Sequence, residues 1–79
     1  NRSVNDRMTT LAFALDGDYI ELKSLLKLTD LVSSGGEAKV VIDDGQVTVD
    51  GQVETRKACK IRLGQVVEFA GTRILIEAP

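Results

Sequence analysis

Two short segments of the sequence hold the residue types that could do chemistry, SGGEAK at Ser34–Lys39 and ETRKACKIR at Glu54–Arg62. In the first, a serine and a glutamate three residues apart predict a helix N-terminus, where backbone N–H groups and partial positive charge favour phosphate. Each glycine lowers helix propensity by about 1 kcal/mol relative to alanine. Because glycine has no Cβ, Gly35 and Gly36 would let a phosphate approach the backbone closely. The alternative is that they only relieve crowding between two helices.

The second segment is a cationic cluster in an acidic chain. It carries a net charge of +3, whereas the whole chain carries −2. If the segment is extended, three of its cations share one side: Arg56, Lys60 and Arg62. Lys57 points to the other side, where the alternation of Cys59 with Ile61 and Leu63 indicates that the cysteine is a buried apolar residue. The cations could follow a phosphate backbone, or they could simply protect a solvated edge strand from aggregation.

Three further lysines fall on predicted helices, and three aspartates lie elsewhere. Lys23 and Lys27 form an i, i+4 pair off the leucine face of the first helix, and Lys39 should reach the surface of the second. The aspartates predict an acidic pole that would orient a polyanion toward the opposite side: Asp43, Asp44 and Asp50. Adjacent aspartates point apart and no third ligand is evident, so we expect no metal site.

The residue types argue against catalysis. The chain has no histidine, the usual general base near neutral pH, and no phosphate-loop lysine motif. Neighbouring cations could lower the pKa of Cys59, which leaves a redox switch as an alternative role for that thiol. We therefore expect no enzymatic activity and no cofactor. With three aromatic residues in all, little remains to stack unpaired bases.

Length and composition predict one small soluble domain. The chain has 79 residues, 43% of them hydrophobic, and no apolar stretch approaches the ~20 residues of a membrane span. A single cysteine excludes an internal disulfide and fits a reducing cytoplasm. Residues 1–7 are polar and without periodicity, so we expect a disordered tail or cloning remnant, with Met8 as the natural start and residues 8–79 as the folded domain. We expect a monomer.

The hydrophobic periodicity predicts the elements that would position these residues. Thr10–Leu15 alternates like a half-buried strand. Asp18–Leu28 then reads as a helix that buries Leu22, Leu25 and Leu26, with Asp18 as its cap and Glu21 completing a capping box. A second helix begins at the Ser34 cap, faces inward with Ala38, Val41 and Ile42, and ends at Gly45.

Beyond Gly45 the period changes to two, which is typical of strands. Asp50-Gly51 between alternating segments is a strong signal for a tight hairpin, and Ala70-Gly71 divides a second pair of strands. The element order is thus strand, helix, helix and a run of strands. This order predicts a small α+β domain, with helices covering one side of a mainly antiparallel sheet.

The segment from Leu22 to Gly71 resembles the S4-like RNA-binding domain, and above all its small standalone bacterial members, the YbcJ-like family. The resemblance is carried by an ordered set of motifs: LLKL, SGG with AK, GQVTVDG, the basic ETRKACK run and GQVVEFAG. It implies an alpha-L motif, in which two helices and the following hairpin form a basic groove that docks onto structured RNA. In many such domains an arginine follows the serine that starts the second helix, where this chain has Gly35.

Position by position, the resemblance assigns the groove to these residues: Lys27, Ser34, Gly35, Gly36, Lys39, Arg56, Lys57 and Lys60. Arg62 is added because of its charge alone. The expected function is non-enzymatic binding to the backbone of structured RNA, such as ribosomal or transfer RNA, in the cytoplasm. The alternative is a protein-interaction module that binds an acidic partner, for example a ribosome-associated protein during ribosome assembly. No membrane partner is expected.

Overall fold

The computed structural model describes residues 9–79, and the predicted tail at residues 1–7 lies outside this range. The described chain forms two helices, α1 (Leu22–Leu28) and α2 (Gly35–Asp43). It also forms seven strands: β1 (Thr9–Ala14), β2 (Ile20–Glu21), β3 (Val47–Val49), β4 (Gln52–Val53), β5 (Lys60–Ile61), β6 (Val66–Phe69) and β7 (Thr72–Glu77). The α+β class is confirmed, and the predicted order of elements is found with one short strand, β2, added before the first helix.

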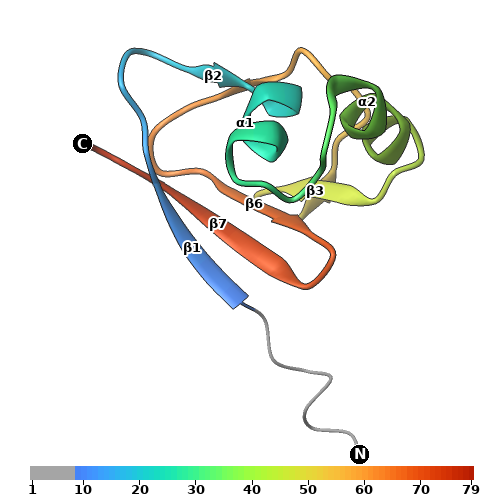
Figure 1. Ribbon diagram of the computed structural model, residues 1–79. Helices are drawn as coiled ribbons and strands as arrows, with labels where there is room; N and C mark the ends of the chain where they lie inside the picture. The colour runs from blue at the N-terminus through green and yellow to red at the C-terminus, as the bar shows by residue number, and fades with distance from the viewer. Residues whose placement is uncertain (1–8) are drawn as a thin grey trace, which may run out of the picture.

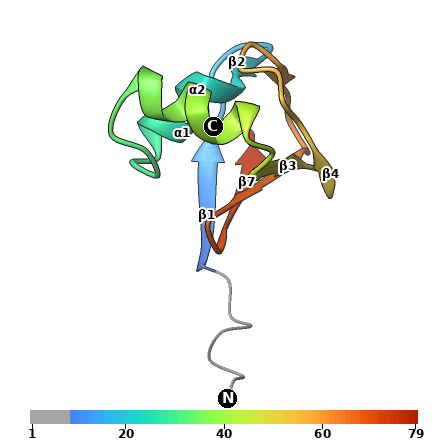
Figure 2. The same ribbon diagram turned by 90° about the vertical axis from the view of Figure 1, so that its right-hand side faces the viewer.

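The strands form a five-stranded sheet with a smaller two-stranded sheet beside it. The larger sheet has the order β1-β7-β6-β3-β4, and β1 runs parallel to β7 while every other pair is antiparallel. The second sheet pairs β2 with β5. Figure 1 shows both helices on one side of the large sheet, and Figure 2 shows the β3–β4 hairpin set to the side of the helices. The helices therefore form one layer and the sheet the other.

The core lies between these two layers. Leu22, Leu25 and Leu26 of α1 are fully buried, as their shared helical face predicts. The predicted inner face of α2 is also confirmed by its buried residues: Ala38, Val41 and Ile42. The sheet contributes fully buried side chains from three strands: Val47, Val67 and Ile74. Because these apolar faces meet one another, the polar faces of both helices are left at the surface.

Both predicted hairpins are present with the backbone that tight turns require. Asp50 and Gly51 have φ of 52° and 86°, and Ala70 and Gly71 have φ of 52° and 79°. Two successive positive φ values are typical of a type I′ turn, whose twist matches that of the flanking strands. The Asp50 carboxylate also accepts a hydrogen bond from the Val66 N–H at 2.9 Å. One of the three aspartates assigned to an acidic pole thus has a structural function.

The predicted start of the first helix is wrong. Asp18 lies outside the helix, Ile20 and Glu21 form β2, and the N-cap residue Glu21 makes no side-chain capping hydrogen bond. Instead, the Leu22 N–H donates to the Cys59 carbonyl at 2.9 Å and the Lys23 N–H donates to the Lys57 carbonyl at 3.0 Å. Carbonyls from a distant loop therefore satisfy the first N–H groups of α1, which no local sequence pattern reveals.

The second helix begins and ends as predicted, with one change in detail. The Glu37 N–H donates to Ser34 Oγ at 3.1 Å, but the Glu37 carboxylate accepts from the N–H and hydroxyl of Ser33, each at 2.8 Å. In the predicted capping box, the Glu37 carboxylate would accept from the N–H of Ser34; in the structure it accepts from the preceding residue, Ser33. At the other end, the Gly45 N–H donates to the Ile42 carbonyl, and Gly45 has φ of 79°.

The basic segment is not extended throughout, which was the condition for its cations to share one side. Only Lys60–Ile61 pairs as β5, and a turn precedes it, closed by a hydrogen bond from the Cys59 N–H to the Arg56 carbonyl at 3.1 Å. Ile61 is fully buried as expected, but Leu63 is exposed and Cys59 is only partly buried. The turn breaks the alternation, so the cations of the segment do not form a single row.

Candidate nucleic-acid interface

Lysines from three separate segments line one open depression, which we call the lysine hollow. Its volume is about 330 Å³, and its lining residues come from α1, the start of α2 and the loop before β5: Lys23, Ser24, Lys27, Gly35, Gly36, Lys39 and Lys57. Four of these seven carry a positive charge. None of the seven is acidic, so the hollow presents concentrated positive charge in a chain whose net charge is negative.

The first helix orients two of these lysines. Its leucines are buried against the core, so the i, i+4 pair Lys23 and Lys27 occupies another face of the same short helix. The predicted site includes Lys27 but omits Lys23. The signal that could have identified Lys23 is this same spacing, which places it one turn from Lys27 along the hollow.

The second helix contributes its bare first turn. A Cβ added to Gly35 would lie 4.0 Å from Lys27 Cδ, and one added to Gly36 would lie 3.8 Å from Ser34 Oγ. Both are ordinary van der Waals distances, so alanine would fit at either position without displacing a neighbour. Relief of crowding between the helices therefore does not explain the glycines. Ser34 does not line the hollow, because its hydroxyl caps the helix.

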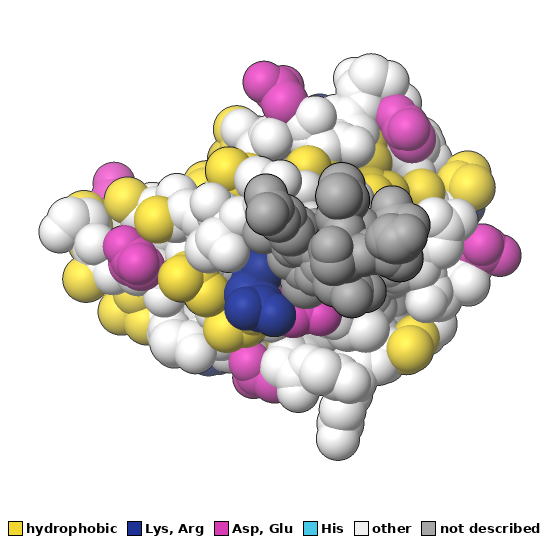
Figure 3. Space-filling model, turned by 90° about the horizontal axis from the view of Figure 1, so that it is seen from below, with side chains coloured by type: hydrophobic (Ala, Val, Ile, Leu, Met, Phe, Trp, Pro, Cys, Tyr) yellow, Lys and Arg dark blue, Asp and Glu magenta, His cyan; other side chains and the backbone are white. Residues whose placement is uncertain are grey.

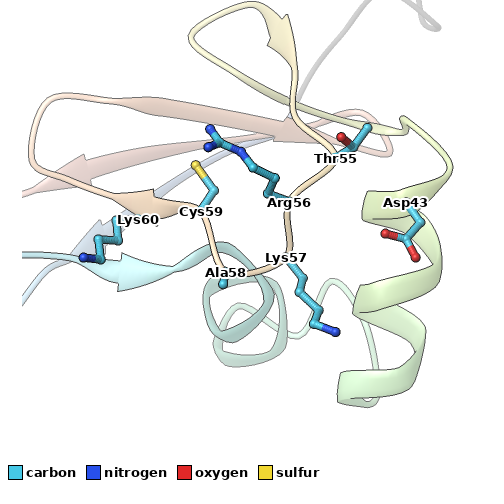
Figure 4. A pocket seen from close by; sticks show the side chains of 7 residues that line it. All are labelled: Asp43, Thr55, Arg56, Lys57, Ala58, Cys59 and Lys60. Carbon is cyan, nitrogen blue, oxygen red and sulfur yellow. The ribbon is translucent and has the colours of Figure 1, made fainter.

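The loop between β4 and β5 brings Lys57 to the helices. Figure 4 shows the Lys57 side chain pointing toward the helices while Arg56, its neighbour in the chain, points the opposite way, toward Cys59. The hydrogen bond between the Lys57 carbonyl and the Lys23 N–H fixes this loop to the start of α1. A second cavity of about 700 Å³ lies along the loop and shares Lys57 with the hollow, but it also includes Asp43.

Arg56 is held away from the lysine hollow by Glu54. The Glu54 carboxylate accepts from Arg56 Nε at 2.9 Å, Nη2 at 3.1 Å and the backbone N–H at 3.0 Å. These hydrogen bonds, above all those from the side chain of Arg56, lower the pKa of Glu54 to about 2. The predicted site residue Arg56 thus already has an anionic partner inside the protein.

Lys60 and Arg62 form a separate group around Tyr19. The Lys60 ammonium lies 5.0 Å from the centre of the Tyr19 ring, and the Arg62 guanidinium carbon lies 5.7 Å from it. Both distances are within the range of cation–π attraction. Neither cation lines the lysine hollow. The structure therefore brings together five of the nine predicted residues in the hollow: Lys27, Gly35, Gly36, Lys39 and Lys57.

The surroundings of Cys59 argue against a reactive thiolate. Burial raises the pKa of this thiol, and the nearby Glu54 carboxylate raises it further, which outweighs the opposing effect of Arg56. A protonated thiol is a poor nucleophile. The redox alternative thus loses the electrostatic basis that the neighbouring cations suggested.

The visible part of the face seen from below in Figure 3 carries side chains of both charges. Figure 3, a view from below, shows one prominent dark blue area among scattered magenta and yellow side chains. Within residues 9–79, no helix is long and apolar enough to cross a membrane. Four lysines of the described chain meet where the two helices and the β4–β5 loop come together.

Sequence comparison identifies relatives with the same pattern. The S4 domain family model matches residues 13–77. YbcJ of Escherichia coli strain K12, provisionally named an RNA-binding protein, is 53% identical over 60 residues, which are 76% of this chain and 86% of that protein. A protein of Bacillus subtilis strain 168, RlbA, provisionally named a ribosome maturation protein, is 36% identical over 58 residues, or 73% of this chain and 82% of its own.

Solved structures agree with the sequence comparison. The solution structure of Escherichia coli YbcJ, described as having an alpha-L motif involved in RNA binding, superimposes with a TM-score of 0.61 at 47% identity, covering 91% of this chain and 90% of that one. The 30S ribosomal protein S4e of Thermoplasma acidophilum shares the fold, with a TM-score of 0.55 at 24% identity over 73% of this chain and 31% of its own. The chain belongs to the S4 domain family and has the alpha-L fold of YbcJ.

Proposed function

We propose that this protein binds structured RNA without catalysing a reaction, and that the lysine hollow is where backbone phosphates bind. The observation that carries the proposal is the convergence of four lysines from α1, α2 and the β4–β5 loop on the glycine-rich start of α2. The relationship to YbcJ, which is provisionally named for RNA binding, supports the same ligand.

No ion pair within residues 9–79 neutralises the charges of the hollow. Two ion pairs occur in the described part of the chain, Glu54–Arg56 and Glu68–Arg73, and neither involves a lysine. Like charges that share a small depression repel one another. An arrangement of this kind favours an anionic ligand that contacts several ammonium groups together. Successive phosphates of an RNA backbone have this property.

The aromatic residues favour structured RNA over single strands. Phe69 is buried, Phe13 packs against the core, and Tyr19 lies under two cations away from the hollow. Proteins that bind single strands use exposed aromatic side chains on which bases stack, and the lysine hollow has none. Recognition would therefore rest on phosphate positions and on the shape of a folded RNA.

Ribosomal RNA is the class of RNA that we favour, because RlbA is provisionally named for ribosome maturation. Transfer RNA remains the second candidate. We further propose that the protein acts as a cytoplasmic monomer. Ribosomal and transfer RNA, the proposed ligands, are found in the cytoplasm.

The experiment is a filter-binding titration with hairpin, duplex and single-stranded RNA at salt concentrations of about 50 and 200 mM, a range over which counterion release weakens phosphate binding strongly. The wild type is compared with Lys27→Ala/Lys57→Ala and with a control, Arg73→Gln, which removes a cation outside the hollow. Salt-sensitive binding to hairpin and duplex, lost in the double variant and kept in the control, is expected. Absence of binding at low salt, or equal loss in both variants, would contradict the proposal.

An acidic protein partner is the competing ligand, and the same titration can include polyglutamate. Both ligands need the lysines, and the RNA proposal also requires Gly35 and Gly36, where the helix start is open to a phosphate. Tighter binding of polyglutamate than of RNA, with no effect of alanine at the glycines, would favour the protein-interaction alternative.

A further inference from the structure

The Glu54–Arg56 pair lies next to the lysine hollow without lining it, and it shapes the loop from which Lys57 enters the hollow. We propose that Glu54 and Arg56 are positioning residues and not phosphate ligands, an inference that rests on the proposed function. Their ion pair fixes the turn at residues 54–59, so that Lys57 joins the hollow and the carbonyls of the turn cap α1. An acidic residue would then be required for binding a polyanion.

The ion pair is tied to the sheet at one end. The Glu54 N–H donates to the Val47 carbonyl of β3 at 3.0 Å, which anchors the backbone of Glu54 to the large sheet. The Glu54 side chain is only 16% exposed, whereas that of Arg56 is 77% exposed. The carboxylate is therefore the fixed partner, and it draws both the guanidinium and the backbone N–H of Arg56 toward itself.

The same turn is tied to α1 at its other end. The carbonyls of Lys57 and Cys59 accept the N–H groups of Lys23 and Leu22, the first two residues of the helix. This helix has seven residues and no side-chain cap, and so short a helix depends on tertiary contacts. A turn that moved would therefore release the helix start along with Lys57.

The chain of contacts thus runs from β3 through Glu54 and Arg56 to the turn, and from the turn to two lysines of the hollow. Lys57 belongs to the turn itself, and Lys23 is bonded to it through its N–H. Figure 4 shows that Arg56 and Lys57, although adjacent, point in opposite directions. Pairing Arg56 with Glu54 is consistent with directing Lys57 toward the helices.

Replacing the Glu54 carboxylate tests the positioning proposal, because a pure charge effect and a positioning effect predict opposite changes in RNA affinity. Removing a negative charge by Glu54→Gln should tighten binding to a polyanion if charge alone matters. Positioning predicts weaker binding to a hairpin RNA by several-fold, with a salt slope shallower by about 0.7–0.9 because one phosphate contact is lost. The matched control is Glu68→Gln, which removes a carboxylate that is also paired with an arginine, at 3.1 Å, but within the sheet. It should not weaken binding.

Two further variants separate positioning from direct contact. Arg56→Lys keeps the charge but loses the two-pronged geometry, so it should weaken binding as Glu54→Gln does. In a Lys57→Ala background, Glu54→Gln should cause little further loss because the residue it positions is gone. Unchanged or tighter binding of Glu54→Gln, or full additivity with Lys57→Ala, would overturn the proposal.

Amide hydrogen exchange supplies a readout that needs no RNA. The proposal predicts faster exchange of the Leu22 and Lys23 amides in Glu54→Gln than in the wild type, and no such change in Glu68→Gln. Unchanged exchange at these amides would overturn the positioning function. If the wild type bound no RNA, the proposed function would fail, while faster exchange would still support the capping of α1 by the turn.

Discussion

The backbone N–H of Lys23 donates to the carbonyl of Lys57 across 3.0 Å, although the two residues are 34 positions apart in the chain. This hydrogen bond joins the first turn of α1 to the β4–β5 loop. Both residues also contribute their side chains to the lysine hollow. The main chain therefore fixes the relative placement of the two backbone positions from which these lysine side chains extend.

Binding should depend steeply on salt. With about four phosphate contacts, one for each lysine of the hollow, the slope of log affinity against log salt should be near −3, a loss of roughly 60-fold between 50 and 200 mM. Lys39→Ala should make this slope shallower by about 0.7–0.9. Affinity measured at five or more salt concentrations checks both values, and a slope near zero would exclude phosphate contacts as the main interaction.

Alanine at the glycines should change stability and binding in opposite directions. Because a Cβ fits at Gly35 and Gly36, each substitution should stabilise α2, by up to about 1 kcal/mol, and raise the melting temperature. The same methyl groups would stand where a phosphate approaches, so affinity for hairpin RNA should fall. Val40→Ala, at an exposed position of the same helix, serves as the control for binding. Unchanged affinity in the double glycine variant would show that the helix start is not a contact.

The Glu54–Arg56 ion pair should be lost only in strong acid. The hydrogen bonds from Arg56 lower the pKa of Glu54 from 4.5 to about 2, so this group stabilises the fold above its unfolded pKa. That contribution is lost as the pH falls from about 4.5 to about 2. Carboxyl NMR titration should give a pKa near 2 in the wild type and closer to 4.5 in Arg56→Gln. A Glu54 pKa that is equal in both proteins would contradict the ion pair.

The Cys59 thiol should react slowly. Burial and the Glu54 carboxylate raise its pKa, so the thiolate fraction near neutral pH is smaller than in an unhindered cysteine. Labelling with a disulfide reagent at pH 7.5 should be slower for the folded protein than for the urea-unfolded protein. Faster labelling of the folded protein would restore the redox alternative.

The sequence predicts most of the fold because its signals are local. The Asp50-Gly51 hairpin, the Gly45 helix end and the Ser34 cap each depend on residues within a few positions of one another. The start of α1 could not be predicted in the same way. Its N–H groups are satisfied by carbonyls near residue 58, and a distant pairing of this kind leaves no trace in nearby residues.

The candidate site was predictable in composition but not in arrangement. Charge and spacing identify Lys27, Lys39 and Lys57, yet only the folded chain shows that they meet. Arg56 has the same charge as Lys57 and lies next to it, but Glu54 two positions earlier binds it. The turn before β5 separates Arg56 from Lys60 and Arg62, which a continuous strand would have aligned. Sequence periodicity cannot reveal a turn that lacks glycine and proline.

Backbone amide NMR during titration with a hairpin RNA would show where RNA contacts the protein. We expect the largest chemical-shift changes on the lining of the hollow: Lys23, Lys27, Gly35, Gly36, Lys39 and Lys57. Amides of β1 and β7 should shift little. Changes centred on those strands, or on the group of Tyr19, Lys60 and Arg62 with the hollow unaffected, would show that RNA binds elsewhere and would contradict the account.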